Sequence, residues 1–171
     1  MGQVLTLDAA LAWREAERAA GRTVVLTNGH FDLLHVGHVR YLQAARALGD
    51  ALIVGLNSDA STAARKPGRP IVPQEERAEL LAALGCVDAV VIFDDLTAEA
   101  LVEALRPDVY AKGGDWNQPG GPRPPEAAVV ERHGGRVIFL PYLPDRSTTR
   151  LIERIQRLRI ADCLRPAERD F

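Results

Sequence analysis

Three histidines lie close together in one short segment of the sequence, at positions 30, 35 and 38. Because His35 and His38 are three residues apart, a helix that begins here can present both imidazoles on one side. The unpaired N–H groups in the first turn of that helix would point the same way, and its dipole favours an anion. Gly37 has no Cβ, so a phosphate could approach the backbone closely. These donors together predict a site for phosphate oxygens whose negative charge grows during a reaction.

The same histidines also allow a metal site, because His30, His35 and His38 could supply the three protein ligands of a catalytic zinc ion. A zinc site leaves Gly37 and the phosphate-type motifs further along the chain without a purpose. A third alternative is a set of ordinary loop and helix-cap histidines. We therefore predict a phosphate site in which no metal is ligated by protein side chains.

Other polar residues with suitable chemistry follow in the sequence. Lys66 lies in a polar loop, and a flexible ammonium suits phosphate oxygens that move during transfer. Arg77 lies at the start of a predicted helix, where a cation opposes the dipole, and this mild cost indicates an anion contact. Ser147 is a good N-cap for the last predicted helix, whose free donors could bind phosphate. Asp32 fits either a plain turn or contact with a substrate or a metal.

The elements that must position these residues alternate between strand and helix. Continuously apolar runs, typical of strands covered on both faces, span residues 23–27, 51–56, 87–93, 108–112 and 136–140. Helical patterns, with Asp8 and Thr97 as expected N-caps, span 8–20, 38–48, 74–84, 97–105, 126–133 and Ser147 to about 159. This alternation predicts an α/β fold with a parallel sheet of about five strands and right-handed crossovers.

A parallel sheet of this kind binds ligands at the carboxyl ends of its strands, near the point where the strand order reverses. The loops that leave the predicted strands span residues 28–37, 57–73, 93–96, 112–125 and 141–147. Neither a P-loop nor a G-x-G-x-x-G dinucleotide fingerprint occurs in the sequence. The phosphate site must therefore be built from histidines, lysines and helix starts in these loops.

Length and composition narrow the class of protein. A chain of 171 residues predicts one domain, with residues from about 160 to 171 as a loose extension. Lysine plus arginine number 21 and aspartate plus glutamate 23, which argues against a protein that coats nucleic acid or an anionic membrane. Only two cysteines occur, far apart, and no signal peptide or membrane span is evident. We therefore expect a cytoplasmic protein.

The histidine segment resembles a known signature. His35-Val36-Gly37-His38, preceded by Asn28-Gly29 and Phe31-Asp32, is similar to the H-x-G-H motif of the nucleotidylyltransferase superfamily. The similarity covers nearly the whole chain and is closest to the bacterial heptose 1-phosphate adenylyltransferases. Their further motifs occur here in order: Gly49-Asp50, Asn57-Ser58-Asp59, Arg69-Pro70-Ile71, Arg77, Val87-Asp88, Pro107-Asp108, Lys112-Gly113-Gly114-Asp115, Gly134-Gly135 and Ser147-Thr148-Thr149.

This resemblance implies a Rossmann-like three-layer sandwich and a reaction. In the family, the AMP moiety of ATP is transferred to a phosphorylated acceptor, and pyrophosphate leaves. A sugar 1-phosphate, heptose 1-phosphate in particular, is the implied acceptor, and Mg²⁺ is expected to accompany ATP. The resemblance also implies a homodimer. Related proteins often carry this domain fused to a sugar kinase. Because 171 residues leave no room for such a domain, we expect any kinase partner to be a separate chain.

The resemblance assigns the site residues to three roles. The expected catalytic residues are His35, His38 and Lys66. The expected nucleotide-binding residues are Asn28, Gly29, Phe31, Gly37, Arg77, Ser147, Thr148 and Thr149. The expected acceptor-binding residues are Asp32, Asn57, Lys112, Gly114 and Asp115.

Two alternatives and one departure remain. Glycerol-3-phosphate cytidylyltransferase resembles the chain at Asp115-Trp116 and at the Ser-Thr-Thr motif, but its usual arginine five residues before the serine is Tyr142 here. The same alternative includes transfer to another small phosphate acceptor, such as a flavin or pantetheine phosphate. A non-catalytic nucleotide-binding protein is the other alternative. His30 stands where the heptose branch usually has cysteine, and its role is open.

Overall fold

The computed structural model describes residues 1–113, 123–141 and 146–163, and the side chains of the last segment as far as Leu158. Within these ranges the strands form one all-parallel sheet of six: β1 (Gln3–Leu5), β2 (Val24–Gly29), β3 (Ala51–Asn57), β4 (Ala89–Phe93), β5 (Val109–Gly113) and β6 (Arg136–Leu140). Their order in the sheet is β1-β4-β3-β2-β5-β6. The chain builds outward from β2 to β4 and then crosses back to β5, so the order reverses between β2 and β5.

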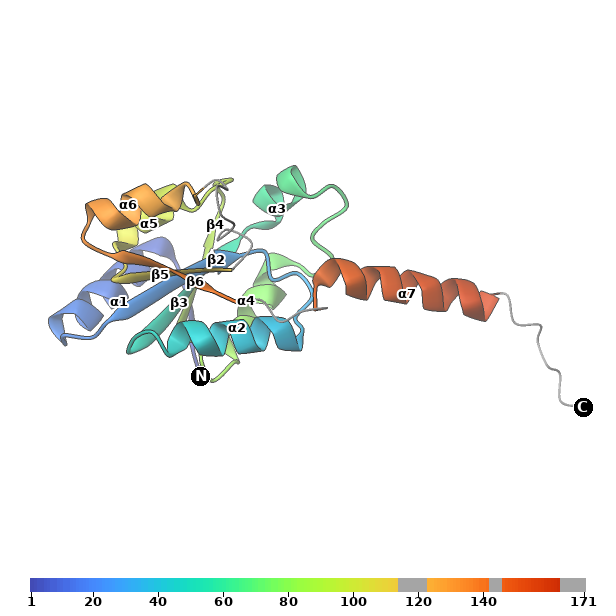
Figure 1. The fold of residues 1–171 in the computed structure, drawn as a ribbon, viewed down its shortest axis with the longest axis horizontal. Helices are drawn as coiled ribbons and strands as arrows, with labels where there is room; N and C mark the ends of the chain where they lie inside the picture. The colour runs from blue at the N-terminus through green and yellow to red at the C-terminus, as the bar shows by residue number, and fades with distance from the viewer. Residues whose placement is uncertain (114–122, 142–145, 164–171) are drawn as a thin grey trace, which may run out of the picture.

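Helices cover both faces of this sheet (Figure 1). They are α1 (Leu7–Ala19), α2 (Val36–Arg46), α3 (Asp59–Arg65), α4 (Gln74–Ala82), α5 (Glu99–Leu105), α6 (Glu126–Arg132) and α7 (Thr148–Cys163). One apolar cluster joins the sheet to α1, α5 and α6, and a second joins it to α2 and α4. The predicted three-layer α/β sandwich is therefore confirmed. No helix in the described part of the chain is both long and apolar enough to cross a bilayer.

Two elements lack a signal in the sequence, β1 and α3. β1 is only three residues long and pairs at the sheet edge with β4, where Val4 stays half exposed. Its formation depends on pairing with β4, and three residues are too few to give a recognisable apolar run. α3 lies in the loop that was expected to be polar, and begins because the Ser58 hydroxyl accepts a hydrogen bond from the Ser61 N–H.

Several helix ends differ from the expected ones. Thr6, rather than Asp8, caps α1, because its hydroxyl accepts from the Ala9 N–H at 3.3 Å. Ala98 stands at the start of α5 in place of Thr97, without a side-chain cap. α2 begins two residues early, at Val36. α7 runs to Cys163, past position 160, from which a loose extension was expected; residues 164–171 lie outside the described ranges.

The amino end of the sheet is held by three aspartates, each of which directly precedes a strand. Asp50 accepts a hydrogen bond from the Thr23 N–H at 2.8 Å, and Asp88 accepts one from the Leu52 N–H at 2.7 Å. Asp108 accepts from the N–H of Val24, the first residue of β2, at 2.7 Å. Each carboxylate thus satisfies a donor at or just before the start of a neighbouring strand, which would otherwise be unpaired.

Candidate functional site

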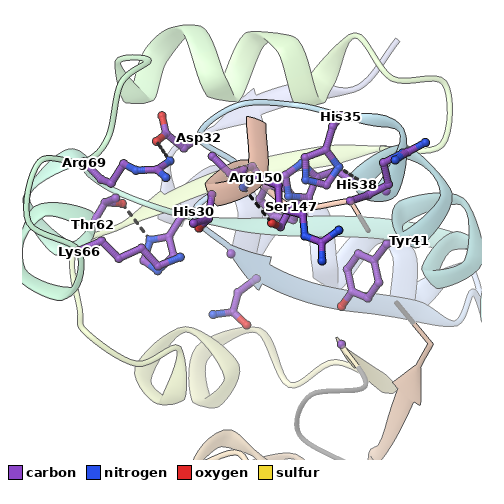
Figure 2. A pocket seen from close by; sticks show the side chains of 18 of the residues that line it. His30, Asp32, His35, His38, Tyr41, Thr62, Lys66, Arg69, Ser147 and Arg150 are labelled. Carbon is purple, nitrogen blue, oxygen red and sulfur yellow. Dashed lines mark hydrogen bonds and ion pairs between the residues drawn. The ribbon is translucent and has the colours of Figure 1, made fainter. Parts of the chain in front are cut away.

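A cavity of about 600 Å³ opens at the carboxyl ends of β2 and β5, where the strand order reverses (Figure 2). This is the position where an open parallel sheet is expected to bind its ligand. The first turns of α2 and α7 border the cavity. Its lining consists of Asn28, Gly29, His30, Phe31, Asp32, His35, Gly37, His38, Tyr41, Thr62, Lys66, Arg69, Lys112, Gly113, Arg146, Ser147, Thr148, Thr149 and Arg150.

Most of the predicted site residues meet at this cavity. Those that line it are Asn28, Gly29, Phe31, Asp32, His35, Gly37, His38, Lys66, Lys112, Ser147, Thr148 and Thr149. Arg77 and Asn57 do not line it. Gly114 and Asp115 lie outside the described residues.

The imidazoles of His35 and His38 stack on each other. Their ring centroids are 3.8 Å apart and their planes differ by 18°. His35 is the N-cap of α2, and its Nδ1 accepts a hydrogen bond from the His38 backbone N–H at 3.4 Å. Because Nδ1 of His35 acts as an acceptor, a neutral ring carries its proton on Nε2. The expectation that the spacing brings both rings to one side of the helix start is confirmed.

Both rings of this pair are neutral near pH 7. Burial, with His35 and Lys66 as neighbours, lowers the pKa of His38 to about 4. Burial and the neighbouring Arg146 lower the pKa of His35. Nδ1 of His38 is buried and has no hydrogen-bond partner among the described residues, so Nε2 is the atom left for a ligand. The pair therefore offers neutral N–H donors rather than two like charges.

Gly37 is required by the packing of this pair. A Cβ at position 37 would lie 2.9 Å from the His35 ring and 3.2 Å from Cβ of Arg146. The sequence indicated only that the glycine could admit a phosphate. The structure adds that any side chain here would displace the His35 ring, so the glycine fixes the position of the ring as well.

Phe31 supports the pair from the other side. Its ring meets the His38 ring edge-on, with 5.3 Å between centroids, and its backbone adopts a left-handed φ of 44°. Gly29 leaves room for this ring, since a Cβ there would lie 3.0 Å from Phe31 Cε2. Phe31 is buried, so its contribution to the site is to hold the His38 ring.

Lys112 is held at the floor of the cavity by three neighbours. Its Nζ donates to Asn28 Oδ1 at 2.8 Å and lies over the ring of Tyr110. The Tyr110 hydroxyl donates to the same Asn28 oxygen at 2.7 Å. The buried carboxylate of Glu126 lies 3.7 Å from Lys112 Nζ. Asn28 and Lys112 are thus fixed relative to each other, on the adjacent strands β2 and β5.

Arg77 was expected to contact the nucleotide, but it does not line the cavity. Its side chain is fully buried and donates to three backbone oxygens, of Val72 at 2.9 Å, His30 at 2.5 Å and Asn57 at 3.0 Å. It also donates to Asp59 Oδ1 at 2.6 Å. Because protein acceptors occupy the guanidinium, Arg77 ties together the loops after β2 and β3. The anion contact inferred from its helix position is made with Asp59.

Asp32 was expected to contact the acceptor, but its carboxylate also binds protein groups. Its buried carboxylate accepts from Arg69 Nη1 at 2.8 Å and from the backbone N–H groups of Ile71 at 2.7 Å and Val72 at 3.0 Å. Burial alone would raise the pKa of Asp32, but these hydrogen bonds hold it below its usual value. The carboxylate therefore attaches segment 69–72, which follows Lys66, to the exit of β2.

Asn57, an expected acceptor contact, does not line the cavity, and its side chain is directed into the protein. Its side chain is buried, and Nδ2 donates to Ser61 Oγ at 3.0 Å. Its backbone oxygen accepts from Arg77. Asn57 thus connects the end of β3 to α3 rather than to the cavity.

Six lining residues were given no site role in the sequence analysis: Tyr41, Thr62, Arg69, Gly113, Arg146 and Arg150. Helical spacing could have found two of them, because Tyr41 follows His38 by three residues and Arg150 follows Ser147 by three. The Tyr41 hydroxyl donates to the Ala111 oxygen at 3.0 Å, which fixes α2 on β5. Thr62 lies on α3, which the sequence did not predict, so no pattern could have placed it.

The zinc alternative gains no support from this geometry. Among the described residues, no three His, Cys, Asp or Glu side chains come together as metal ligands. His30 Nδ1 instead pairs with Thr62 Oγ1 at 3.0 Å, away from the stacked rings of His35 and His38 (Figure 2).

Comparison with known proteins finds relatives that are identical to this chain at about half of the aligned positions. The chain is 54% identical over 146 residues to "Bifunctional protein HldE" of Syntrophotalea carbinolica, covering 82% of this chain and 28% of that protein. It is 52% identical over 154 residues to the protein of the same name from Geobacter sulfurreducens, covering 90% and 31%. The chain thus spans about three tenths of the length of these relatives.

A solved structure and a family model extend the comparison. The chain is similar to the crystal structure of the lipopolysaccharide core biosynthesis protein from Thermoplasma volcanium GSS1, with a TM-score of 0.57 and 27% identity. That similarity covers 72% of this chain and 98% of the other. The family model described as cytidylyltransferase-like matches residues 26–154, a range that includes β2, the stacked histidines and the start of α7. By this match over most of its length, the chain belongs to the cytidylyltransferase-like family.

Proposed function

We propose that this chain transfers the AMP moiety of ATP to a sugar 1-phosphate, with heptose 1-phosphate as the acceptor, and releases pyrophosphate. The observation that carries the proposal is the stacked pair of His35 and His38 at the amino end of α2, which lines one cavity together with the adjacent start of α7. Neutral N–H donors and helix amino ends suit a polyphosphate. The similarity to the HldE proteins and to a lipopolysaccharide core biosynthesis protein favours a sugar phosphate as acceptor.

The proposed reaction is an in-line displacement. A phosphate oxygen of the acceptor attacks the α-phosphorus of ATP and forms the new P–O bond. The bond from the α-phosphorus to the bridging oxygen breaks, and its electron pair leaves with pyrophosphate. A phosphate monoester is already anionic near neutral pH, so no strong general base is needed. The protein contributes positioning and stabilisation of the growing charge.

The residues of the cavity divide these tasks. His35 and His38 donate from Nε2 to the α- and β-phosphate oxygens as the bridging bond breaks. Ser147 and Thr149 add hydroxyl donors, and the start of α7 adds backbone N–H donors, toward the leaving pyrophosphate. The Thr148 hydroxyl donates to the Leu33 oxygen at 3.5 Å. Lys66 and Lys112 supply ammonium groups, the first on a loop and the second fixed on β5.

Magnesium belongs to this proposal as part of the Mg·ATP substrate. The carboxylate of Asp32 already accepts three hydrogen bonds, and the described residues contain no cluster of metal ligands. An ion held mainly by phosphate oxygens and water needs no such cluster, because Mg²⁺ keeps several waters when it binds with phosphates.

Pyrophosphate release from a panel of substrates tests the proposal. ATP, CTP, GTP and UTP are each combined with a heptose 1-phosphate, another sugar 1-phosphate, glycerol 3-phosphate and pantetheine 4′-phosphate, with acceptor-free controls. We expect the highest kcat/KM with ATP and the heptose 1-phosphate. Preference for CTP with glycerol 3-phosphate would establish the second candidate, which the name of the matched family favours. Nucleotide binding without pyrophosphate from any pair would indicate a non-catalytic protein.

The partners follow from the same proposal. Because ATP is a cytoplasmic metabolite, we expect the chain to act in the cytoplasm. A phosphorylating enzyme must supply the sugar phosphate. Sedimentation of the purified chain tests the homodimer that the resemblance implies.

A further inference from the structure

His30 lies in the cavity but outside the stacked pair. Figure 2 shows it with Thr62 and Lys66 toward one end, while His35, His38 and Ser147 lie toward the other. Its Nδ1 is 3.0 Å from Thr62 Oγ1, and its backbone oxygen accepts from the buried Arg77. Two contacts therefore fix the ring, one on the side chain and one on the main chain. The mechanism proposed above does not use this residue.

The contact with Thr62 determines which ring nitrogen carries the proton. Thr62 is fully buried on α3, and its hydroxyl has no other acceptor among the residues that the structure describes. A buried hydroxyl donates its proton wherever an acceptor is in reach. Thr62 therefore donates to Nδ1 of His30, and the neutral ring carries its proton on Nε2.

The charges around His30 keep this ring neutral. Burial, together with the cations Lys66, Arg65 and Arg77, lowers the pKa of His30 to about 4, although Asp32 acts in the opposite direction. A second positive charge is thus disfavoured beside Lys66. The ring offers one neutral N–H donor, while the neighbouring lysine and arginine side chains supply the charge.

The in-line geometry of the proposed reaction determines which substrate reaches this end. The nucleophile must approach the α-phosphorus from the side opposite the leaving pyrophosphate. If the polyphosphate follows His35, His38 and the start of α7, the attacking phosphate approaches from the end that holds His30 and Lys66. Lys66 and Arg69 line that end and match an anionic acceptor phosphate.

We propose that His30 is an acceptor-binding residue that donates from Nε2 to the phosphate of the acceptor, with Thr62 as the positioning residue that fixes the donor tautomer. The inference rests on the proposed function, because it assigns the attacking substrate to this end of the cavity. An imidazole N–H is a stronger donor than the thiol that the heptose branch usually has at this position.

Steady-state kinetics with each substrate varied in turn test this role. The variants are His30→Ala, which removes the donor, and His30→Gln, whose terminal amide keeps an N–H near the position of Nε2. For His30→Ala we expect the KM of the acceptor to rise about tenfold or more and the KM of ATP to change less than about twofold, as for one lost hydrogen bond to a charged group. His30→Gln should recover most of the loss. Equal changes in both KM values, or none in His30→Ala, would overturn the proposal.

Thr62 provides a matched pair of variants. Thr62→Val removes the hydroxyl at nearly constant volume, and Thr62→Ser keeps it. We expect only the valine variant to raise the KM of the acceptor, with thermal unfolding as the check that both are folded. A valine variant that is folded and kinetically normal would remove Thr62 from the proposal.

A measurement that does not depend on turnover separates this proposal from the proposed function. Long-range ¹H–¹⁵N NMR of the imidazoles reports the tautomer of His30, assigned by its loss in His30→Gln. We expect the Nε2–H form at neutral pH in the wild type and a mixture in Thr62→Val. An Nδ1–H form or a protonated ring would refute the His30 proposal even if the enzyme is active. The expected tautomer in a chain that releases no pyrophosphate would instead refute the proposed function.

Discussion

His35 and His38 differ in what each does for the structure, although they form one pair. His35 caps α2 through Nδ1, so its loss removes a hydrogen bond of the helix start. His38 makes no hydrogen bond through its buried Nδ1 to any described residue, so the fold does not depend on one. Variants of His38 therefore report on chemistry more cleanly than variants of His35.

We predict that His38→Ala lowers kcat at least a hundredfold, about 3 kcal/mol of barrier, by analogy with loss of one oxyanion-hole donor. Pyrophosphate release measures the rate, and thermal unfolding shows whether the fold is kept. His35→Ala serves as the comparison, because it should lose activity and also about 1 kcal/mol of stability with the N-cap. Normal turnover of a folded His38→Ala protein would remove the stacked pair from the mechanism.

The same histidines make stability depend on pH. His30 and His38 have ordinary pKa values of 6.5 when unfolded and about 4 in the folded protein. Between these values the unfolded chain binds more protons than the folded one, so the free energy of unfolding falls as the pH drops from 6.5 towards 4. Urea unfolding at about pH 7 and about pH 5 measures this loss. A His30→Gln/His38→Gln double variant should lose less stability than the wild type over this pH range. An equal loss would contradict the assignment of this pH dependence to the two histidines.

The residue scale also shows what the sequence could reveal about the site. The pairing of His35 with His38 follows from their spacing on one helix start, which is a local property. The inward contacts of Asp32 and Arg77 include pairs that are far apart in the sequence: Asp32 and Arg69 are separated by 37 residues, and His30 and Arg77 by 47. No local pattern encodes such pairs, so both residues were interpreted as ligand contacts.

At the scale of elements, Asp32 and Arg77 connect the loops around the cavity. Asp32 attaches segment 69–72 to the end of β2, and Arg77 attaches the same segment, through the Val72 oxygen, to the end of β3. Lys66 begins this loop at the end of α3. The position of its ammonium over the cavity therefore depends on two buried side chains that do not themselves act on ATP.

We predict that Asp32→Asn loosens this loop, because an amide offers one acceptor oxygen in place of two and no charge for Arg69. Hydrogen exchange of residues 66–72 should become faster by about tenfold or more, as expected for the loss of one or two buried hydrogen bonds. Turnover should fall along with it. Asp95→Asn, an exposed carboxylate on the loop after β4, is the matched control. A higher KM for the acceptor with unchanged exchange would instead show direct contact of Asp32 with that substrate.

Elements differed in how well the sequence predicted them, and for physical reasons. β2, β3, β4 and β5 are buried along most of their length, so each contains a run of mainly apolar residues. The edge strand β6 is only partly buried, but it contains the apolar run Val137 to Leu140. β1 has only three residues and depends on pairing with β4. α3 begins at a side-chain cap within a polar segment and buries Ser61 and Thr62 rather than an apolar face. Periodicity detects burial of apolar side chains, so both were missed.

At the scale of the whole molecule, the two ends of the sheet have different compositions. The carboxyl end carries the cavity, with His30, His35 and His38 and the two lysines Lys66 and Lys112. The amino end carries Asp50, Asp88 and Asp108, which bind backbone N–H groups there. The sequence analysis assigned these aspartates only to family motifs. In the structure they have a direct role in holding neighbouring strands together.

We predict that Asp108→Ala destabilises the protein by about 1–3 kcal/mol, because it leaves the buried Val24 N–H without its acceptor and removes a partner of the buried Arg14. The KM values of both substrates should stay unchanged, since Asp108 lies at the opposite end of the sheet from the cavity. Urea unfolding and pyrophosphate release measure the two effects. Glu79→Ala, an exposed glutamate on α4, is the control and should alter neither. Loss of activity in folded Asp108→Ala would contradict this separation.

This polarity of the sheet has a consequence for evolution and for engineering. Since all six strands point the same way, the loops that border the cavity leave one rim, while aspartates secure the other. A loop grafted from a distant relative onto the cavity rim would leave those aspartate contacts in place. Chimeras made in this way should therefore prefer the acceptor substrate of the protein that supplied the loop. They should also refold in the same yield as the parent.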